Sequence, residues 1–312
     1  MHLDQFTNIA AYNFPDADVR HLETCVACLY WAFSIDDVGD EGELYATPDI
    51  IKSDVNLYLQ ALYHKDFSST DPYAMMLHEF RLSMLRQVSL PNTIPVYQSV
   101  FKRIQATTSP GSLGRFIRGL EEYFDSEVVQ SRRRLQHDIP PVSEFIVLRR
   151  DTVAGPFLWA LVEYSLDINL PHYVFDDPVV IEIDKAAKDI MAWQNDICSF
   201  NKEQAEDDYQ NLVCSIMANR RVELQDAIGI LTDMLESRVD EYINLKSRLP
   251  SFGTNIDSEL MKFITGVENV IQGGIIWSYM SPRYYSSEEL GGLELQSMII
   301  QLKTTGTPSG SV

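Results

Sequence analysis

Three oxygen-bearing side chains recur at intervals of four in WQNDICSFNKEQAE, residues 193–206. They are Asn195, Ser199 and Glu203. Because four residues make slightly more than one helical turn, an α-helix would place them along one stripe. At about 1.5 Å of rise per residue, Glu203 would lie about 12 Å from Asn195 along the helix axis. An amide oxygen, a hydroxyl and a carboxylate are hard donors, so the segment predicts half of a metal site. An exposed polar helix face would give the same pattern.

A second acidic cluster, DDVGDE at residues 36–41, is the best candidate for the other half of that site. In a helix, Asp36 and Asp40 would lie one turn apart on one face, with Asp37 and Glu41 on the next. Carboxylates this crowded repel one another unless they are solvated or bind cations. Mg²⁺ takes carboxylate oxygens and often shares its ligand shell with substrate phosphates. A solvated acidic helix end is the alternative for this cluster taken by itself.

Positive charges stand near these segments or interrupt apolar ones. Arg149 and Arg150 fall within VLRRDTVAGP, Lys202 lies inside the second cluster, and Arg283 with Tyr284 follows the apolar VIQGGIIWSYM. The planar fork of arginine matches phosphate oxygens, and lysine supplies a point charge. Each could equally be a surface or salt-bridge residue.

The elements that would carry these residues are helical almost throughout, because apolar residues recur at steps of three and four. VRHLETCVACLYWAFSIDDV, which begins at residue 19, is one such segment, and Asp18 is its expected N-cap. Further helices are expected at 48–64, 72–88, 93–107, 112–137, 141–151, 156–168, 178–203, 207–248 with a break near 219, and 255–279. Proline and glycine occupy many of the joints.

Composition limits the classes of function. A net charge of −20 argues against nucleic acid or an anionic membrane surface as the main partner. No secretory signal and no transmembrane run is seen, and the four cysteines are expected to be buried, reduced thiols of a cytoplasmic protein. The arginines at 132–134 lack a nearby acidic motif and are interpreted as a solvated helical face.

Taken together, DDVGDE and NDICSFNKE resemble the aspartate-rich and NSE metal motifs of class I terpene synthases. Arg149 precedes Asn195 by 46 positions, the spacing at which that family places its diphosphate-sensing arginine. RRDTVAG resembles the stretch after that sensor, although it has one more residue before its glycine, so Arg149 and Arg150 both stay candidates. SPRYY resembles the family's C-terminal Arg-Tyr pair, and the NKE ending is similar to the fungal sesquiterpene branch.

The resemblance implies an all-α, single-domain helical bundle around a deep apolar cavity, with a catalytic domain over 1–303 and a disordered tail over 304–312. It implies three Mg²⁺ ions on two sets of ligands. The first set is Asp36 with Asp37, Asp40 and Glu41 nearby, and the second is Asn195, Ser199 and Glu203. The expected diphosphate donors are Arg149, Arg150, Lys202, Arg283 and Tyr284.

A carbocation formed by loss of diphosphate needs an apolar cavity, and Phe33 and Trp277 are the candidates to stabilise it by cation–π contact. Ordinary core packing is the alternative role for both. Farnesyl diphosphate is the expected substrate and a cyclic sesquiterpene the product, while C10 and C20 diphosphates stay open. A homodimer is a family expectation. The competing functions are a chain-elongating prenyltransferase and a non-catalytic, cation-binding helical scaffold.

Overall fold

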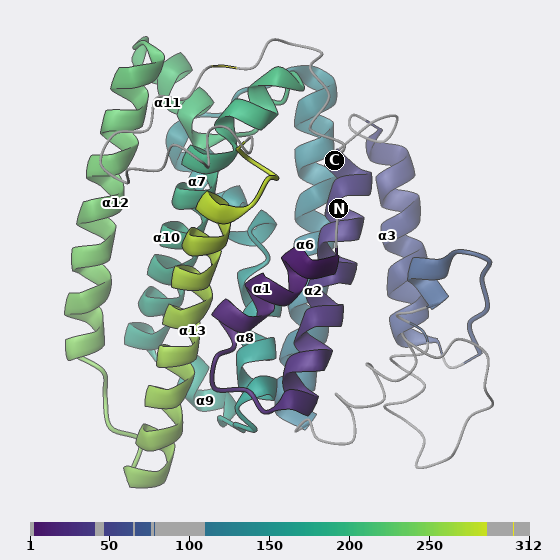
Figure 1. Ribbon diagram of the computed structural model, residues 1–312, viewed down its shortest axis with the longest axis vertical. Coiled ribbons are helices and arrows are strands. Elements are labelled where there is room, and N and C mark those ends of the chain that lie inside the picture. The colour runs from purple at the N-terminus through teal and green to yellow at the C-terminus, as the bar shows by residue number, and fades with distance from the viewer. Residues whose placement is uncertain are drawn as a thin grey trace.

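A computed structural model of the chain shows an all-α bundle (Figure 1). It describes residues 3–40, 47–64, 66–75, 78, 110–285 and 302, and within these ranges the regular structure is entirely helical. The helices are α1 (Leu3–Asn13), α2 (Val19–Asp40), α3 (Pro48–Tyr63), α6 (Pro110–Gln136), α7 (Val142–Thr152), α8 (Gly155–Ser165), α9 (His172–Phe175), α10 (Pro178–Ala205), α11 (Leu212–Arg220), α12 (Leu224–Ser247) and α13 (Thr254–Met280).

The periodicity of the sequence located most of these helices to within a few residues. The helix expected over 207–248 is two helices, α11 and α12, and the break lies just beyond 219, where Arg221 adopts a left-handed φ of 55°. The short α9 and the N-terminal α1 were not anticipated. The expected helix over 93–107, most of that over 72–88, and the tail at 304–312 lie outside the described residues.

Helix α2 carries the first acidic cluster at its C-terminal end. Its start is fixed by Asp18, whose carboxylate accepts a hydrogen bond from the backbone N–H of His21 at 2.9 Å, as expected of an N-cap. Cys25 and Cys28 on this helix are buried free thiols. The register of α2 then places Leu29, Phe33 and Asp36 on the side that lines the central cavity.

Helix α10 carries the second cluster and lies between two apolar cores. The larger core gathers side chains from α1, α2, α6, α8, α10 and α13, and the smaller one packs α10 against α7, α11 and α12. The N-cap of α10 is Asp177, whose side chain accepts hydrogen bonds from the N–H groups of Val179 and Val180. Packing against both cores sets the orientation in which α10 presents its side chains to the cavity.

Helices α7 and α8 meet at a break directly after the arginine pair. Thr152 ends α7, Val153 is its C-cap, and Ala154 takes a left-handed φ of 58°, which is uncommon for a residue other than glycine. Such strain costs about 1–3 kcal/mol and is often found at functional sites. Both Val153 and Ala154 line the cavity.

No helix in the described part of the chain is long and apolar enough to cross a membrane.

Candidate active site

A cavity of about 220 Å³ lies at the centre of the bundle. Its lining is acidic and basic at the end where α2 and α10 present their charged residues, and mainly apolar further in. Asp36, Asn195, Lys202, Glu203, Arg149 and Arg283 line the polar part, and Leu29, Leu120, Phe157, Met191 and Val270 line the apolar part.

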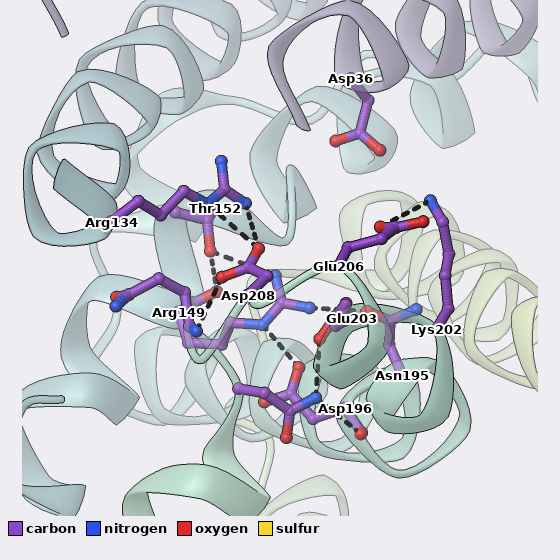
Figure 2. A network of polar contacts seen from close by, with 12 residues as sticks. Asp36, Arg134, Arg149, Thr152, Asn195, Asp196, Lys202, Glu203, Glu206 and Asp208 are labelled. Carbon is purple, nitrogen blue, oxygen red and sulfur yellow. Dashed lines mark hydrogen bonds and ion pairs between the residues drawn. The ribbon is translucent and has the colours of Figure 1, made fainter. Parts of the chain in front are cut away.

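Helix α10 brings two of the three side chains of the predicted stripe to the cavity wall. Asn195 and Glu203 line the cavity (Figure 2). Asn195 accepts a hydrogen bond from Arg149 Nη2 through its Oδ1 at 2.6 Å, and its amide nitrogen donates to the hydroxyl of Tyr284 at 3.1 Å. Glu203 Oε2 accepts from the amide of Asn211 at 2.8 Å. Ser199 lies between them on the helix but is not among the cavity-lining residues. It is 3% exposed, and within the described part of the chain its Oγ has no hydrogen-bond partner.

Asp36 faces this stripe from the opposite helix. Figure 2 shows its carboxylate projecting from α2 into the space above Asn195, Lys202 and Glu203. Its Oδ1 accepts from the Tyr123 hydroxyl at 3.2 Å. The expected ligand Glu41 lies outside the described residues, as do the side chains of Asp37 and Asp40.

The two neighbouring arginines point to different parts of the molecule. Arg149 lines the cavity and donates from Nε to Asp196 at 2.8 Å, from Nη1 to Thr152 at 3.1 Å and from Nη2 to Asn195. Arg150 instead lines a groove on the outside of α7, α10 and α12, where it pairs in a bidentate manner with Asp189 at 2.7 and 2.8 Å.

The other expected diphosphate donors gather at the cavity mouth. Arg283 lies 3.3 Å from the second carboxylate oxygen of Asp36, which ties the segment after α13 to α2. Tyr284, the next residue, is 6% exposed and bonded to Asn195, which ties the same segment to α10. Lys202 is buried, and its Nζ lies 4.0 Å from Glu206.

The surroundings of Glu203 disfavour the charged form of its carboxyl. Burial raises the pKa of its carboxyl to about 8, and the negative charges of Asp208 and Asp196 act in the same direction. The hydrogen bond from Asn211 and the charge of Arg149 oppose this shift only in part. Although burial alone would lower the pKa of Arg149, the carboxylates of Asp196 and Glu203 outweigh it and raise that pKa. A cation beside Glu203 would therefore relieve an unfavourable cluster of carboxylates.

Phe33 and Trp277 meet just inside the polar mouth. Their ring centroids lie 5.2 Å apart, and both rings line the cavity. The guanidinium carbon of Arg283 lies 5.4 Å from the centroid of Phe33. The two aromatic rings therefore pack against each other and also border the cavity. Phe33 lies about one helical turn before Asp36 on α2.

Two side chains of this site, Arg134 and Asp196, were misread or missed from sequence. Arg134 was expected on a solvated face, but it is 4% exposed, lines the cavity and donates from Nε and Nη2 to Asp208 at 3.0 and 2.8 Å. That expectation was wrong because its acidic partner is 74 residues away in sequence. Asp196, between the recognised Asn195 and Ser199, anchors both Arg149 and the backbone N–H of Leu212. The sequence signal that could have identified Asp196 is its position directly after Asn195 in the motif.

The residues present fit a divalent cation. Among the described residues no group of three or more His, Cys, Asp or Glu side chains is placed to hold a metal ion. However, the α10 stripe draws on Asn and Ser as well as Glu. The buried, unpartnered Ser199 Oγ lies one turn from each of Asn195 and Glu203 on α10. A buried hydroxyl without a partner is costly, and a bound cation would supply the missing contact.

Comparison with solved structures establishes the fold. Germacradien-4-ol synthase from Streptomyces citricolor matches with a TM-score of 0.69 at 18% identity, covering 87% of this chain and 82% of that one. An all-α bundle of this kind, enclosing an apolar cavity, is the class I terpenoid synthase fold.

The sequence comparisons establish the family. The model of the family described as "Terpene synthase family 2, C-terminal metal binding" matches residues 27–241. Sesquiterpene synthase 1 of Postia placenta is 29% identical over 245 residues, 77% of this chain and 72% of that protein. Alpha-muurolene synthase of Coprinopsis cinerea is 32% identical over 200 residues, 64% of this chain and 46% of that protein. The chain belongs to the terpene synthase family and is a fungal-type terpene cyclase that uses a divalent metal.

Proposed function

We propose that this terpene cyclase binds farnesyl diphosphate together with Mg²⁺, releases the diphosphate and cyclises the resulting carbocation to a sesquiterpene hydrocarbon or alcohol. The observation that supports it best is the juxtaposition across one cavity: Asp36 on α2 faces Asn195 and Glu203 on α10, with apolar lining further in. The names of the fungal relatives favour a C15 substrate.

Two ligand sets would hold the metal. Asp36, with Asp37, Asp40 and Glu41 from the same acidic segment, would hold two of three ions, and Asn195, Ser199 and Glu203 the third. When bound, Mg²⁺ supplies Lewis-acid stabilisation of the departing diphosphate.

The chain's own cations act on the same leaving group. Arg149 is held by Asp196 at Nε, so its Nη2, now on Asn195 Oδ1, is the group that turns toward a diphosphate oxygen. Arg283 and Tyr284 would add donors from the segment that follows α13, and Lys202 from α10. Donors aimed at the oxygen that gains charge lower the barrier to breaking the allylic C–O bond.

Arg150 is not among the proposed diphosphate ligands. Its fork is committed to Asp189 in the outer groove, on the side of α7 away from the cavity. Of the two arginines, Arg149 is therefore the proposed diphosphate sensor.

The hydrocarbon part of the substrate would lie in the apolar part of the cavity. The faces of Phe33 and Trp277 border its mouth, where positive charge first develops. A cation over an aromatic face gains about 2 kcal/mol or more when it is desolvated. The surrounding apolar side chains exclude water from the cation.

The test is gas chromatography–mass spectrometry of products from purified protein given C10, C15 or C20 prenyl diphosphate, with Mg²⁺ or with EDTA. The expected result is a cyclic C15 product that forms only with Mg²⁺. Longer linear diphosphates would identify a chain-elongating transferase instead, and no product from any substrate would favour a non-catalytic scaffold. The homodimer and the division at residue 303 stay predictions.

A further inference from the structure

Asn211, a residue just before α11, holds one oxygen of the Glu203 carboxylate. Its side chain is fully buried, and the amide nitrogen donates to Glu203 Oε2 at 2.8 Å and to the backbone carbonyl of Asp196 at 2.8 Å. Asp196 and Glu203 are seven residues apart, which is about two turns of α10. Both hydrogens of the amide are therefore used on α10, one on its backbone and one on a predicted metal ligand.

The amide oxygen of Asn211 has a separate role. It accepts a hydrogen bond from the backbone N–H of Val213 at 2.8 Å, which makes Asn211 the N-cap of α11. The cap needs only an oxygen acceptor, whereas the bond to Glu203 needs an N–H donor. A substitution can therefore keep the first role and remove the second.

The loop between α10 and α11 is held by hydrogen bonds to α10 and α6, and these fix where Asn211 lies. The backbone N–H of Asp208 donates to the carbonyl of Glu203 at 2.9 Å. The Asp208 carboxylate accepts from the backbone N–H of Gln210 at 2.9 Å and from the fork of Arg134, which faces it in Figure 2. Asn211 thus reaches Glu203 from a loop that has its own hydrogen-bonded support.

The carboxylate that Asn211 holds is accessible from the cavity. Glu203 is partly exposed and lines the cavity, whereas Asn211 lies behind it and does not. Carboxylates that bind metal ions are themselves held by hydrogen bonds, and loss of such a partner typically lowers metal affinity by about 10–100-fold. Asn211 has the position of such a partner.

We infer that Asn211 is a positioning residue that holds the Glu203 carboxylate in the orientation in which it binds the metal ion. The inference rests on the proposed function, which takes Glu203 as a metal ligand, and it adds a residue outside both metal motifs. Asn211 acts through Glu203 and touches neither the ion nor the substrate. A carboxylate held in one orientation loses less conformational freedom when an ion binds, so the ion binds more tightly.

The test uses Asn211→Ser and Asn211→Asp, which separate the two roles of the residue. Serine and aspartate cap helices about as well as asparagine does. The serine side chain is too short to reach Glu203, and an ionised aspartate has no hydrogen to donate. Binding of Mn²⁺ in the presence of inorganic diphosphate is followed by loss of the electron paramagnetic resonance signal of the free ion. Both variants should bind Mn²⁺ at least about tenfold more weakly than wild type.

A second readout is the rate of diphosphate release from farnesyl diphosphate as the Mg²⁺ concentration is varied. Asn211→Ser should raise the Mg²⁺ concentration that gives half the maximal rate by about tenfold. Saturating Mg²⁺ should restore its kcat to within about threefold of wild type, because the ligand itself is still present.

The matched control is Asn219→Ser, the same substitution on α11. It removes an amide that donates to the carbonyls of Pro140 and Ser215 at 3.3 and 2.8 Å and contacts no predicted metal ligand. Asn219→Ser should bind Mn²⁺ as wild type does, even where its melting temperature falls as far as that of Asn211→Ser.

Mn²⁺ affinity within about twofold of wild type in a folded Asn211 variant would overturn the inference and leave the residue as a helix cap. Equal losses of affinity in Asn211→Ser and Asn219→Ser would overturn it as well, in favour of general destabilisation. Should Asn211→Ser fail to fold, Asn211→Asp decides by the same measurement, since it keeps the size of the side chain.

The same data separate failure of the inference from failure of the proposed function. A wild-type protein that forms no cyclic product and binds no Mn²⁺ with diphosphate would overturn both. A wild type that forms a Mg²⁺-dependent product, together with an Asn211→Ser variant of unchanged Mn²⁺ affinity, would overturn the inference alone.

Discussion

Two arginine–aspartate clusters adjoin α7, one in the cavity and one in the outer groove, and they differ in how fully their polar groups are paired. In the cavity, Arg149 is bonded to Asp196, Thr152 and Asn195, and Asn195 is itself a candidate metal ligand. In the outer groove, Arg150 and Arg238 both pair with Asp189, which is 1% exposed. The groove cluster joins α7, α10 and α12, and both carboxylate oxygens of Asp189 accept hydrogen bonds from arginine. The cavity cluster adjoins Glu203, whose pKa is raised to about 8, and the buried Ser199 hydroxyl, which has no partner among the described residues. Unrelieved charge and missing partners favour the cavity cluster as the proposed ligand site.

The largest effect is expected from removing a metal ligand on either side of the cavity. Glu203→Gln and Asp36→Asn should each lower kcat/KM by at least about 10³-fold, because Lewis-acid stabilisation of the leaving group is worth several kcal/mol. Steady-state release of diphosphate measures this. Circular dichroism should show the helical fold retained, and activity within tenfold of wild type in both variants would contradict the ligand assignment.

Changing Arg149 and Arg150 separately to alanine tests whether the two clusters have different roles. Arg149→Ala should lower kcat by about 10²–10³, the cost of removing one donor from a developing oxyanion. Arg150→Ala should change kcat by less than about threefold and instead lower the free energy of unfolding by about 1–3 kcal/mol, because Asp189 loses one of its two arginines.

Kinetics and chemical denaturation of both variants provide the measurement. Equal losses of kcat in the two would remove the distinction between the clusters. A larger loss for Arg150→Ala would make it the diphosphate sensor.

A smaller effect is expected at the aromatic pair. Phe33→Leu keeps the apolar surface but removes the ring face, so the rate of diphosphate release should fall by about 30-fold, equivalent to about 2 kcal/mol of cation–π stabilisation. Val26→Leu, on the same helix but outside the cavity lining, is the control. Equal rates for Phe33→Leu and wild type would mean that Phe33 serves core packing only.

A further effect, on stability and not on turnover, is expected from pH in the metal-free protein. The folded-state pKa of Glu203, about 8, lies above its ordinary value of 4.5, so the folded state binds more protons between these values. Its contribution to stability is therefore fully present below about pH 4.5 and is lost as pH rises toward 8, by at most about 1.4 kcal/mol for each pH unit. Denaturation in EDTA from pH 5 to 9 tests this against Glu203→Gln. Parallel pH profiles of the two proteins would contradict the assigned shift.

Spacing predicted the fold and the main site because helical periodicity and local motifs carry that information. Asn195, Ser199 and Glu203 share a helix, so their relation was readable from intervals of four, and the comparisons confirm the terpene cyclase and its all-α fold. The roles of individual residues stay predictions.

Contacts between distant segments were not readable. Arg134 meets Asp208 across 74 positions, and Asp36 meets Arg283 across 247. The choice between Arg149 and Arg150 also needed the structure, since adjacent residues on a helix differ in direction and both orientations are compatible with the motif.

The most direct measurement is a crystal structure with Mn²⁺ in place of Mg²⁺ and with inorganic diphosphate, collected at an energy where Mn²⁺ scatters anomalously. Anomalous peaks should lie beside Asp36 and beside Asn195, Ser199 and Glu203, with diphosphate oxygens on Arg149 and Arg283. Peaks confined to the outer groove beside Asp189, or a diphosphate bound by Arg150 with none in the cavity, would contradict the division of the two clusters.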